Sequence, residues 1–350
     1  MVTGISSSIS RRDAIVGLAS AALSAGPAVA QDGDDPIVLT MYGGASERAF
    51  MAALIEPFQR ATGIKVIPKL GSPAEWLTSA IINKNRPEID ILWIGFPESI
   101  RAISEDVVQP LSESRIPNMA KVRPKLRDLY DGKGVGHEYA AFGIGYRTDM
   151  VKEPPKSWAD LLNPKFAGQI AMPDIVSPGC WELLMMATKL SGGNEANLDP
   201  GIEAVQKARG GIKRFYKNLT EAANLLDAGE VPIVGPITDF RVHAMREAGK
   251  PVAFVMPSEG VLPSLLSFHI AKNTKHTAAC EKFIDFALSV EGQSAFCNEL
   301  VCGTARADAT LKPAVAAKVA PYESLVIFDW RKVLPNTRRY VEAWNRKVTR

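Results

Sequence analysis

The sequence predicts an α/β fold built from mainly parallel sheets with covering helices. Three observations support it. A short strand, a glycine turn and a helix follow one another repeatedly over residues 37–95, which is the pattern of a parallel sheet covered by helices. The chain has 350 residues, enough for two domains, with 46% hydrophobic and 23% charged residues as in soluble globular proteins. Its net charge of +3 does not indicate a basic surface for binding nucleic acid.

The first 30 residues have the parts of a secretory leader. Arg11 and Arg12 precede an uncharged run over 14–30 that ends in Ala-Val-Ala. The paired arginines favour the twin-arginine export route, with cleavage after about Ala30. The alternative is a membrane anchor, but the run is shorter than the ~18 residues of a spanning helix. We therefore expect an exported, periplasmic protein whose fold begins after residue 30.

The first strand–helix unit is the most regular part of the chain. A β-rich run over 37–42 predicts a buried strand, broken by Gly43-Gly44. Ser46 is expected to cap a helix that continues to about Thr62, with one apolar stripe of Phe50, Leu54 and Phe58. Gly63 is expected to end this helix.

Two further strands, over 64–67 and 90–94, follow with a helix over 71–82 between them. In such sheets ligands collect beyond the carboxyl ends of the strands, where glycine lets backbone N–H groups approach them. The residues at these ends are therefore candidate ligand-binding residues: Tyr42, Gly43, Gly44, Ser72, Gly95 and Phe96. For any single glycine, the alternative of a simple turn stays open.

The middle of the chain predicts a crossing between two lobes and then a second set of elements. A strand over 140–146 follows a hairpin region at 131–138, and Gly143 and Gly145 are expected flex points. The later elements are expected as strands over 169–172, 231–234, 251–256 and 265–270, and as helices over 181–190, 211–219, 220–229, 238–248 and 278–289.

The stretch PKSWADLLNPKFAGQIAMPD, residues 155–174, resembles the segment that opens the second lobe of type-2 periplasmic solute-binding proteins of ABC importers. Further pieces resemble the same family in the same order along the chain: 55–66, 143–146, 226–231, 257–260 and 283–293. The nearest subgroups, in extracellular solute-binding protein family 1, bind polyamines, ferric iron or its complexes, thiamine and aminoalkylphosphonates.

The resemblance implies a two-lobed type-2 fold, each lobe a mixed, mainly parallel sheet with covering helices, joined by two crossover segments. The first lobe is expected over 31–146 and 262–350, and the second over 147–261. It also implies capture of a small polar solute by hinge closure and delivery to an inner-membrane permease and ATPase. We expect a monomer with no cofactor and no nucleic-acid partner.

Family position adds candidate ligand-binding residues beyond the first three strands: Tyr146, Ser177, Trp181, Glu182, Thr238, Asp239, Glu259 and Ser264. Ser177 is expected to cap the next helix, Trp181 to stack on the solute and Glu182 to pair with a cation. Each has a structural alternative. Trp181 is as easily explained by helix packing, Asp239 by an N-cap and Glu259 by holding its turn.

This sequence lacks motifs of two of the subgroups it resembles, and this limits the classes of solute that we expect. Polyamine binders of this kind carry a tryptophan and an acidic residue after the P-x-E-G motif, and the stretch 261–266 has neither. Ferric-ion binders often use adjacent tyrosines, which this chain lacks. A small polar or anionic metabolite is therefore our hypothesis, with a polyamine or a ferric complex as alternatives.

The rival class is a secreted two-lobed enzyme. The sequence contains no G-x-S-x-G, H-E-x-x-H or Walker phosphate loop, and we expect no catalytic residue and no metal site. His137, His243, His269 and His276 have no evident nucleophile or metal partner in the sequence. Among the four cysteines, Cys297 and Cys302 are close enough to pair. A disulfide and buried free thiols are equally compatible with their spacing.

Overall fold

The computed structural model describes residues 36–349 and contains one mixed sheet of ten strands within them. The strands are β1 Ile37–Met41, β2 Val66–Leu70, β3 Ile91–Gly95, β4 Val135–Arg147, β5 Ile170–Pro173, β6 Ile212–Tyr216, β7 Ile233–Thr238, β8 Val252–Val255, β9 Leu262–Ile270 and β10 Gly303–Thr304. Their order is β2-β1-β3-β9-β4-β7-β5-β6, with β8 and β10 also paired to β4.

Helices follow most of the strands, as the sequence pattern predicts. They are α1 Ala45–Phe50, α2 Glu56–Thr62, α3 Pro73–Ile82, α4 Phe96–Ser104, α5 Pro124–Arg127, α6 Cys180–Leu190, α7 Asp199–Ala208, α8 Leu219–Asp227, α9 Asp239–Glu247, α10 Thr277–Ala287, α11 Val290–Leu300, α12 Pro313–Ala316, α13 Trp330–Val333 and α14 Thr337–Trp344. A π-helical turn, Met51–Ile55, joins α1 to α2 into one rod, which matches the single predicted helix.

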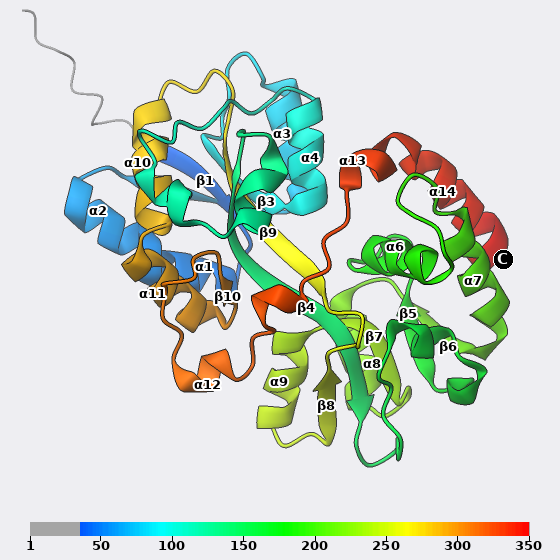
Figure 1. Ribbon diagram of the computed structural model, residues 1–350. Helices are drawn as coiled ribbons and strands as arrows, with labels where there is room; N and C mark the ends of the chain where they lie inside the picture. The colour runs from blue at the N-terminus through cyan, green and yellow to red at the C-terminus, as the bar shows by residue number, and fades with distance from the viewer. Residues whose placement is uncertain (1–35, 350) are drawn as a thin grey trace, which may run out of the picture. The chain divides into compact units, whose positions relative to one another are not determined.

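The sheet is parallel at both ends and antiparallel in the middle. β1 runs parallel to β2 and β3, and β5 runs parallel to β6 and β7. β9 is antiparallel to both β3 and β4. The elements around β2, β1 and β3 form the first lobe, and those around β7, β5 and β6 form the second. β4 and β9 run side by side between the two (Figure 1).

β4 belongs to both lobes because it changes partners along its length. Its first part, Val135–Phe142, pairs with β9, and its last part pairs with β7 and β8. Gly143 lies at this change of partner. A Cβ there would lie 2.4 Å from the ring of Phe254 and 2.5 Å from the carbonyl of Val255. Glycine is therefore required by close approach, in addition to any flexing that the sequence suggests.

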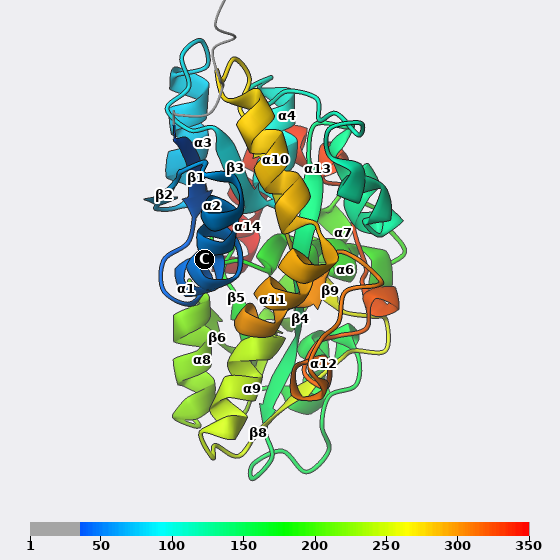
Figure 2. The same cartoon turned by 90° about the vertical axis from the view of Figure 1, so that its left-hand side faces the viewer.

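An aromatic core holds the helices of the first lobe together. Figure 2 shows α10 and α11 beside α1 and α2. Phe58 packs edge-on against Phe283 at 5.2 Å, and Phe50 packs against Phe296 at 4.9 Å and Trp93 at 4.7 Å between ring centroids. Such edge-to-face pairs add to the stabilisation from apolar burial. The predicted stripe is thus confirmed as the buried face of this rod.

The block 155–174 is structural. Ser157 Oγ accepts from the N–H of Ala159 at 3.0 Å, and Asp160 accepts from the N–H of Ser157 at 3.1 Å, which forms a capping box. The fully buried Trp158 donates from its indole nitrogen to the carbonyl of Gly260 at 2.8 Å. Gly168, at φ +77°, makes the turn into β5. These contacts fix how the second lobe begins.

The helix predicted over 211–219 is wrong. Residues 212–216 form β6, which lies parallel to β5 with Met172 opposite Phe215. The fully buried Tyr216 donates its hydroxyl to the carbonyl of Pro236, which anchors the strand end. Asn218 then caps α8 by accepting from the N–H of Glu221 at 2.9 Å. Pairing with the open edge of β5 overrides the local pattern.

The predicted cap of the first helix is also wrong. Gly44, not Ser46, occupies the N-cap position at φ +73° and ψ −122°, a conformation that side chains disfavour. Ser46 lies inside the first turn of α1.

The end of the chain contacts the second lobe. Tyr340 on α14 accepts from the N–H of Leu198 at 3.2 Å, and Arg209 at the end of α7 donates to the carbonyl of Val348. Arg339 also pairs with Asp199. Residues 337–349, which are predicted to belong to the first lobe, therefore also contact the second, and the lobe boundaries remain predictions.

The predicted leader lies outside the described residues. Between residues 36 and 349, no helix has the length and hydrophobicity needed to cross a bilayer.

The contact at Gly143 predicts a stability effect. Gly143→Ala should lower the free energy of unfolding by about 1–3 kcal/mol, because its methyl group overpacks the β4–β8 contact. Chemical denaturation measures this. The matched control is Gly210→Ala, since a Cβ at Gly210 meets nothing within 4 Å. It should change stability by less than about 0.5 kcal/mol. Equal stability of both variants would contradict the close approach.

Candidate functional site

A cavity of about 1060 Å³ lies where the two lobes meet. Its walls come from the end of β1, the β3–α4 junction, the start of α3, the loop before α6, the start of β9 and the segment around α13. Eight of the predicted site residues line it: Tyr42, Ser72, Gly95, Phe96, Ser177, Trp181, Glu182 and Ser264. The strand-end argument therefore locates a real cavity, and residues from both lobes meet in it.

The other six predicted site residues do not line this cavity: Gly43, Gly44, Tyr146, Thr238, Asp239 and Glu259. Gly44 caps α1, and Tyr146 lies in β4 opposite Ala253. Glu259 holds its turn by accepting from the hydroxyl of Ser157 and from the N–H of Trp158 at 3.2 Å.

Asp239 is buried beneath β4. One of its oxygens accepts from the N–H of Phe240 at 2.8 Å and the other from the N–H of Ala141 at 3.3 Å. Thr238, not Asp239, is the N-cap residue of α9. The carboxyl thus connects α9 to the crossing strand, and burial raises its pKa to about 7.

The entrance to α6 differs from the predicted one. Gly179, at φ +85°, is the N-cap residue, so Ser177 does not cap this helix. Ser177 instead donates its N–H to the carbonyl of Asp174 at 2.8 Å. The turn orients the first residues of α6 so that Trp181 and Glu182 both line the cavity.

Two carboxyl groups from different lobes share the cavity. Glu98 comes from the first turn of α4 and Glu182 from the first turn of α6. Burial raises the pKa of Glu182 to about 7; a backbone hydrogen bond opposes this, and the negative charge of Glu98 adds to it. Burial also raises the pKa of Glu98, against the opposing effects of its own backbone N–H and Arg101. Among the described residues, neither carboxyl forms a salt bridge that would offset its burial, and burial outweighs the effect of Arg101 on Glu98.

Sequence reasoning missed Glu98, although a signal was available. It follows Gly95-Phe96-Pro97 at the carboxyl edge of β3, within the first turn of a helix. Its side chain folds back over Gly95, where a Cβ would lie 2.7 Å from its carboxyl oxygen. A side chain on Gly95 would displace this carboxylate.

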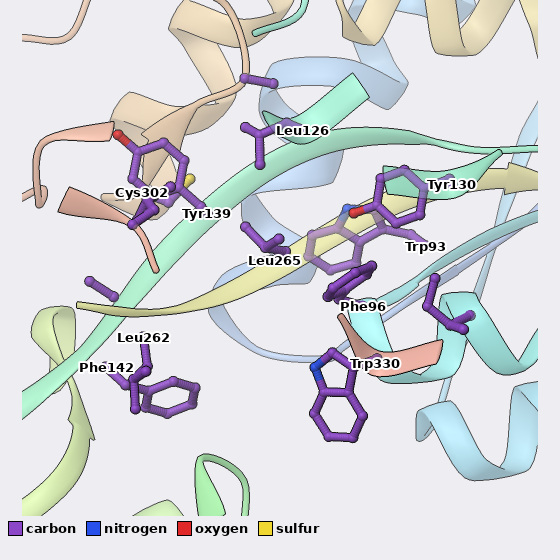
Figure 3. Close-up of a cluster of buried hydrophobic side chains, with 14 of the residues drawn as sticks. Trp93, Phe96, Leu126, Tyr130, Tyr139, Phe142, Leu262, Leu265, Cys302 and Trp330 are labelled. Atoms are coloured by element: carbon purple, nitrogen blue, oxygen red, sulfur yellow. The ribbon is translucent and has the colours of Figure 1, made fainter. Parts of the chain in front are cut away.

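Aromatic rings form much of the remaining wall. Tyr42 packs on Trp76 at 5.3 Å and Trp93 at 5.7 Å between ring centroids. The rings of Trp181 and Trp330 are tilted against each other, with 6.2 Å between their centroids and an interplanar angle of 56°. Figure 3 shows Trp330 beside Phe96, at the same side of the β4–β9 pair. Such faces suit the alkyl chain or the cationic end of a solute.

The segment from Val326 to Thr337 was not predicted as part of the site, yet it lines one side of the cavity. Arg331 fixes it to the first lobe by donating to the carbonyl of Leu129 at 2.6 Å and to Asp131 at 2.8 Å. These contacts join residues about 200 positions apart. No turn motif in the sequence indicates such a contact.

One serine–histidine arrangement does occur. His269 Nε2 lies 2.9 Å from both Ser99 Oγ and Ser267 Oγ, and its Nδ1 lies 2.8 Å from the carbonyl of Lys133. All three side chains are fully buried, so a substrate cannot reach them. Burial lowers the pKa of His269 to about 4. This network is structural.

Over residues 36–349, no group of three or more histidine, cysteine, aspartate or glutamate residues could hold a metal ion.

The sequence over residues 99–336 matches the family model described as bacterial extracellular solute-binding protein. The chain belongs to this family. The α/β fold predicted from the sequence is confirmed, and so is the assignment of this solute-binding protein to ABC transport. Solute-binding components of ABC importers bind small solutes and work with a membrane permease and an ATPase.

Two curated relatives illustrate the family. This solute-binding protein is 26% identical over 283 residues to the spermidine/putrescine-binding periplasmic protein of Escherichia coli K12, covering 77% of this chain and 78% of the relative. It is 23% identical over 286 residues to the gamma-aminobutyric acid-binding protein of Pseudomonas aeruginosa PAO1, covering 79% of this chain and 78% of the relative.

Solved structures share the two-lobed fold. An ABC transporter structure from Clostridium perfringens superposes with a TM-score of 0.81 at 22% identity, covering 89% of this chain and 99% of that one. The Atu4243–GABA receptor superposes with a TM-score of 0.74 at 23% identity, covering 89% and 96%. At these identities the likeness establishes the fold alone.

The raised pKa of Glu182 predicts how the stability of the solute-free protein depends on pH. Because its folded-state pKa is about 7, its contribution to stability is full below its unfolded pKa and is lost as the pH rises through 7. Glu182→Gln should raise the unfolding free energy at pH 8 by about 2 kcal/mol and flatten the decline between pH 5 and 8.

Thermal and urea denaturation across this pH range measure the effect. The control is Glu299→Gln, at an exposed position on α11, which should leave the pH dependence unchanged. An unaltered pH profile in Glu182→Gln would show that Glu182 is well solvated.

Proposed function

We propose that this protein captures a small solute bearing one protonated amine between its lobes and delivers it to an ABC permease and ATPase. The observation that carries this proposal is the pair Glu98 and Glu182, which enters one aromatic-walled cavity from opposite lobes. The proposal sharpens the predicted small polar solute and replaces its anionic variant with a cationic group.

The electrostatics favour a cation. Two nearby carboxyls taken out of water are destabilised in their charged form unless a positive group pairs with them. An ammonium group supplies both the charge and N–H donors for Glu98 and Glu182. The faces of Tyr42, Trp181 and Trp330 can then cover its carbon chain.

The charges around the rim limit how positive the solute is. Besides Glu98 and Glu182, the cavity is lined by Glu105, Arg101 and Arg331. Arg101 pairs with Glu105 at 3.9 Å and Arg331 with Asp131 at 2.8 Å, so only the two carboxyls of Glu98 and Glu182 are left for a solute, and a long polycation is poorly matched. A zwitterion, with its ammonium at the two glutamates and its acidic end toward the arginines, fits this distribution better. The compounds in the names of the two relatives, gamma-aminobutyric acid and spermidine or putrescine, all contain an amine group.

The mechanism that follows is charge-controlled closure. Without solute, ionised Glu98 and Glu182 repel each other across the cavity and favour an open arrangement. A bound ammonium group contacts both lobes at once and favours the closed one. β4, β9 and the segment around α13 connect the lobes and accommodate this movement.

The remaining features of the predicted function are part of the same proposal. We infer that residues 1–30 direct export to the periplasm, with cleavage after about Ala30, and that the mature protein acts as a monomer. It binds without turnover, so the solute should be released chemically unchanged. Mass spectrometry of solute released from the purified protein tests this: a stoichiometric, unaltered compound supports a binder, and conversion supports the secreted enzyme.

A ligand panel tests the solute class. Calorimetry and thermal shift with gamma-aminobutyric acid, putrescine, spermidine, phosphate, citrate and glucose should show stabilisation by amine compounds, strongest for the zwitterion. Glu98→Gln and Glu182→Gln should each weaken binding by about tenfold or more, the effect of losing one charged hydrogen bond. Glu299→Gln is the control with unchanged affinity. Stabilisation by phosphate or citrate alone would exclude the amine, and stabilisation by polyamines alone would exclude the zwitterion.

The affinity should also depend on pH. The pKa of Glu182 is about 7 without solute, and binding an ammonium group requires the carboxylate, so binding releases a proton. Affinity should therefore rise between pH 5 and pH 7, by up to about tenfold per pH unit for one proton. Calorimetry at several pH values measures this rise, which Glu182→Gln should reduce to the part contributed by Glu98. Tighter binding at pH 5 than at pH 8 would contradict the proposal.

A further inference from the structure

Two cysteines meet where α11 ends. The N–H of Cys302 donates to the carbonyl of Cys297 at 3.1 Å, and Val301 between them has the left-handed values φ +61° and ψ +58°. This is the Schellman arrangement of a helix C-terminus, in which the side chains at the two ends of that hydrogen bond come into contact. The backbone thus brings the two cysteines together.

The two cysteine side chains are close enough to influence each other. Burial raises the pKa of the Cys302 thiol, and the neighbouring thiol of Cys297 adds to this rise. Cys297 Sγ lies 3.7 Å from the carbonyl of Gly303, the residue after Cys302. Both cysteines are buried, with exposed fractions of 0% and 3%. The four cysteines of the described residues are free thiols in this structure.

The turn is held in a conformation that its own sequence disfavours. A β-branched residue at positive φ is strained, and glycine is the usual residue at this position. Gln293 fixes the segment by donating to the carbonyl of His137 at 3.0 Å and accepting from the N–H of Ala305 at 2.8 Å. Strain of this kind persists only where the surroundings determine the backbone.

The surroundings of Cys302 include the strand that joins the two lobes. Figure 3 shows Cys302 beside Tyr139 of β4. The next residue, Gly303, pairs with Tyr139, and a Cβ on it would lie 2.1 Å from the tyrosine ring. The cysteine pair therefore sits between α11 and the crossing strand.

We propose that Cys297 and Cys302 form an intramolecular disulfide when the protein is in an oxidising compartment. The two thiols lose two protons and two electrons and form one S–S bond. A disulfide oxidant, such as oxidised glutathione or a protein disulfide donor, accepts them and becomes two thiols. One cysteine thiolate attacks the oxidant, and the second displaces it from the mixed disulfide.

Because both sulfurs are buried, the reaction takes place during folding or when the end of α11 opens. The location rests on the proposed export, but the chemistry does not depend on the solute. The bond would tie α11 to β10 and so to β4. It would also remove a free thiol near Glu138, whose burial raises its pKa to about 8.

Peptide mapping of the full chain tests the proposal directly. The folded protein, and protein refolded from urea, are each equilibrated with oxidised and reduced glutathione, denatured, alkylated and digested with trypsin. Cys297 and Cys302 then share the peptide 283–306, whereas Cys280 falls in 276–282 and Cys180 in 166–189. We expect peptide 283–306 unalkylated and lighter than the dithiol form by the mass of two hydrogen atoms, with the other two peptides alkylated.

Full alkylation of peptide 283–306 in both the folded and the refolded samples would overturn the proposal. A disulfide in the refolded sample alone supports it, with bond formation before α11 packs. Neither result depends on amine binding, so failure here is separate from failure of the proposed solute class.

Variants supply a second measurement. Reduction should lower the Tm of the unaltered protein by about 3 °C, as expected for opening a short disulfide loop in a chain of this length. Cys302→Ser should show no redox dependence of Tm. Cys280→Ser, which removes a buried thiol elsewhere, should retain it. A Tm that is the same in both redox states of the unaltered protein would contradict the bond.

Discussion

The pairing of β4 is the interaction on which the rest of the structure depends. One half of this strand completes the sheet of the first lobe through β9, and the other half completes the sheet of the second lobe through β7 and β8. The change of partner occurs at Gly143, where only a residue without Cβ fits. The cavity lies beside this crossing, so its two walls are positioned by one continuous backbone.

The cavity brings together two carboxyl groups whose burial disfavours their charged form. Its carboxyls come from the first turns of α4 and α6, and their burial raises their pKa values. The aromatic rings beside them supply no positive charge. A site that is electrostatically unsatisfied when empty can favour closure around a cation, because the solute relieves the cost of burying the carboxylates.

Much of the fold follows from local sequence signals, and the exceptions have physical reasons. β1, which precedes Gly43, and β3, which ends at Gly95, were predictable because an apolar run and a glycine turn are each encoded within a few residues. β6 was taken for a helix because its strand character comes from pairing with β5, which the local pattern does not contain. Tertiary pairing outweighs propensity in such segments.

The site divides in the same way. Strand-end and family arguments located Tyr42, Phe96, Trp181 and Glu182 in the cavity. They also selected Asp239 and Glu259, which do not line the cavity and whose carboxyls accept backbone N–H groups. Trp330 and its neighbours could not be predicted as cavity residues. Their position depends on contacts with residues distant in the sequence, and the local pattern does not indicate such contacts.

The position of this last wall has a consequence for biosynthesis. β3 pairs with β9, so the sheet of the first lobe stays incomplete until about 170 further residues have been translated. The cavity also needs the segment 326–337, which is translated later than β9. A nascent chain therefore has no complete pocket, and the solute cannot guide its early folding. Selection by the solute begins only once the segment 326–337 has joined the fold.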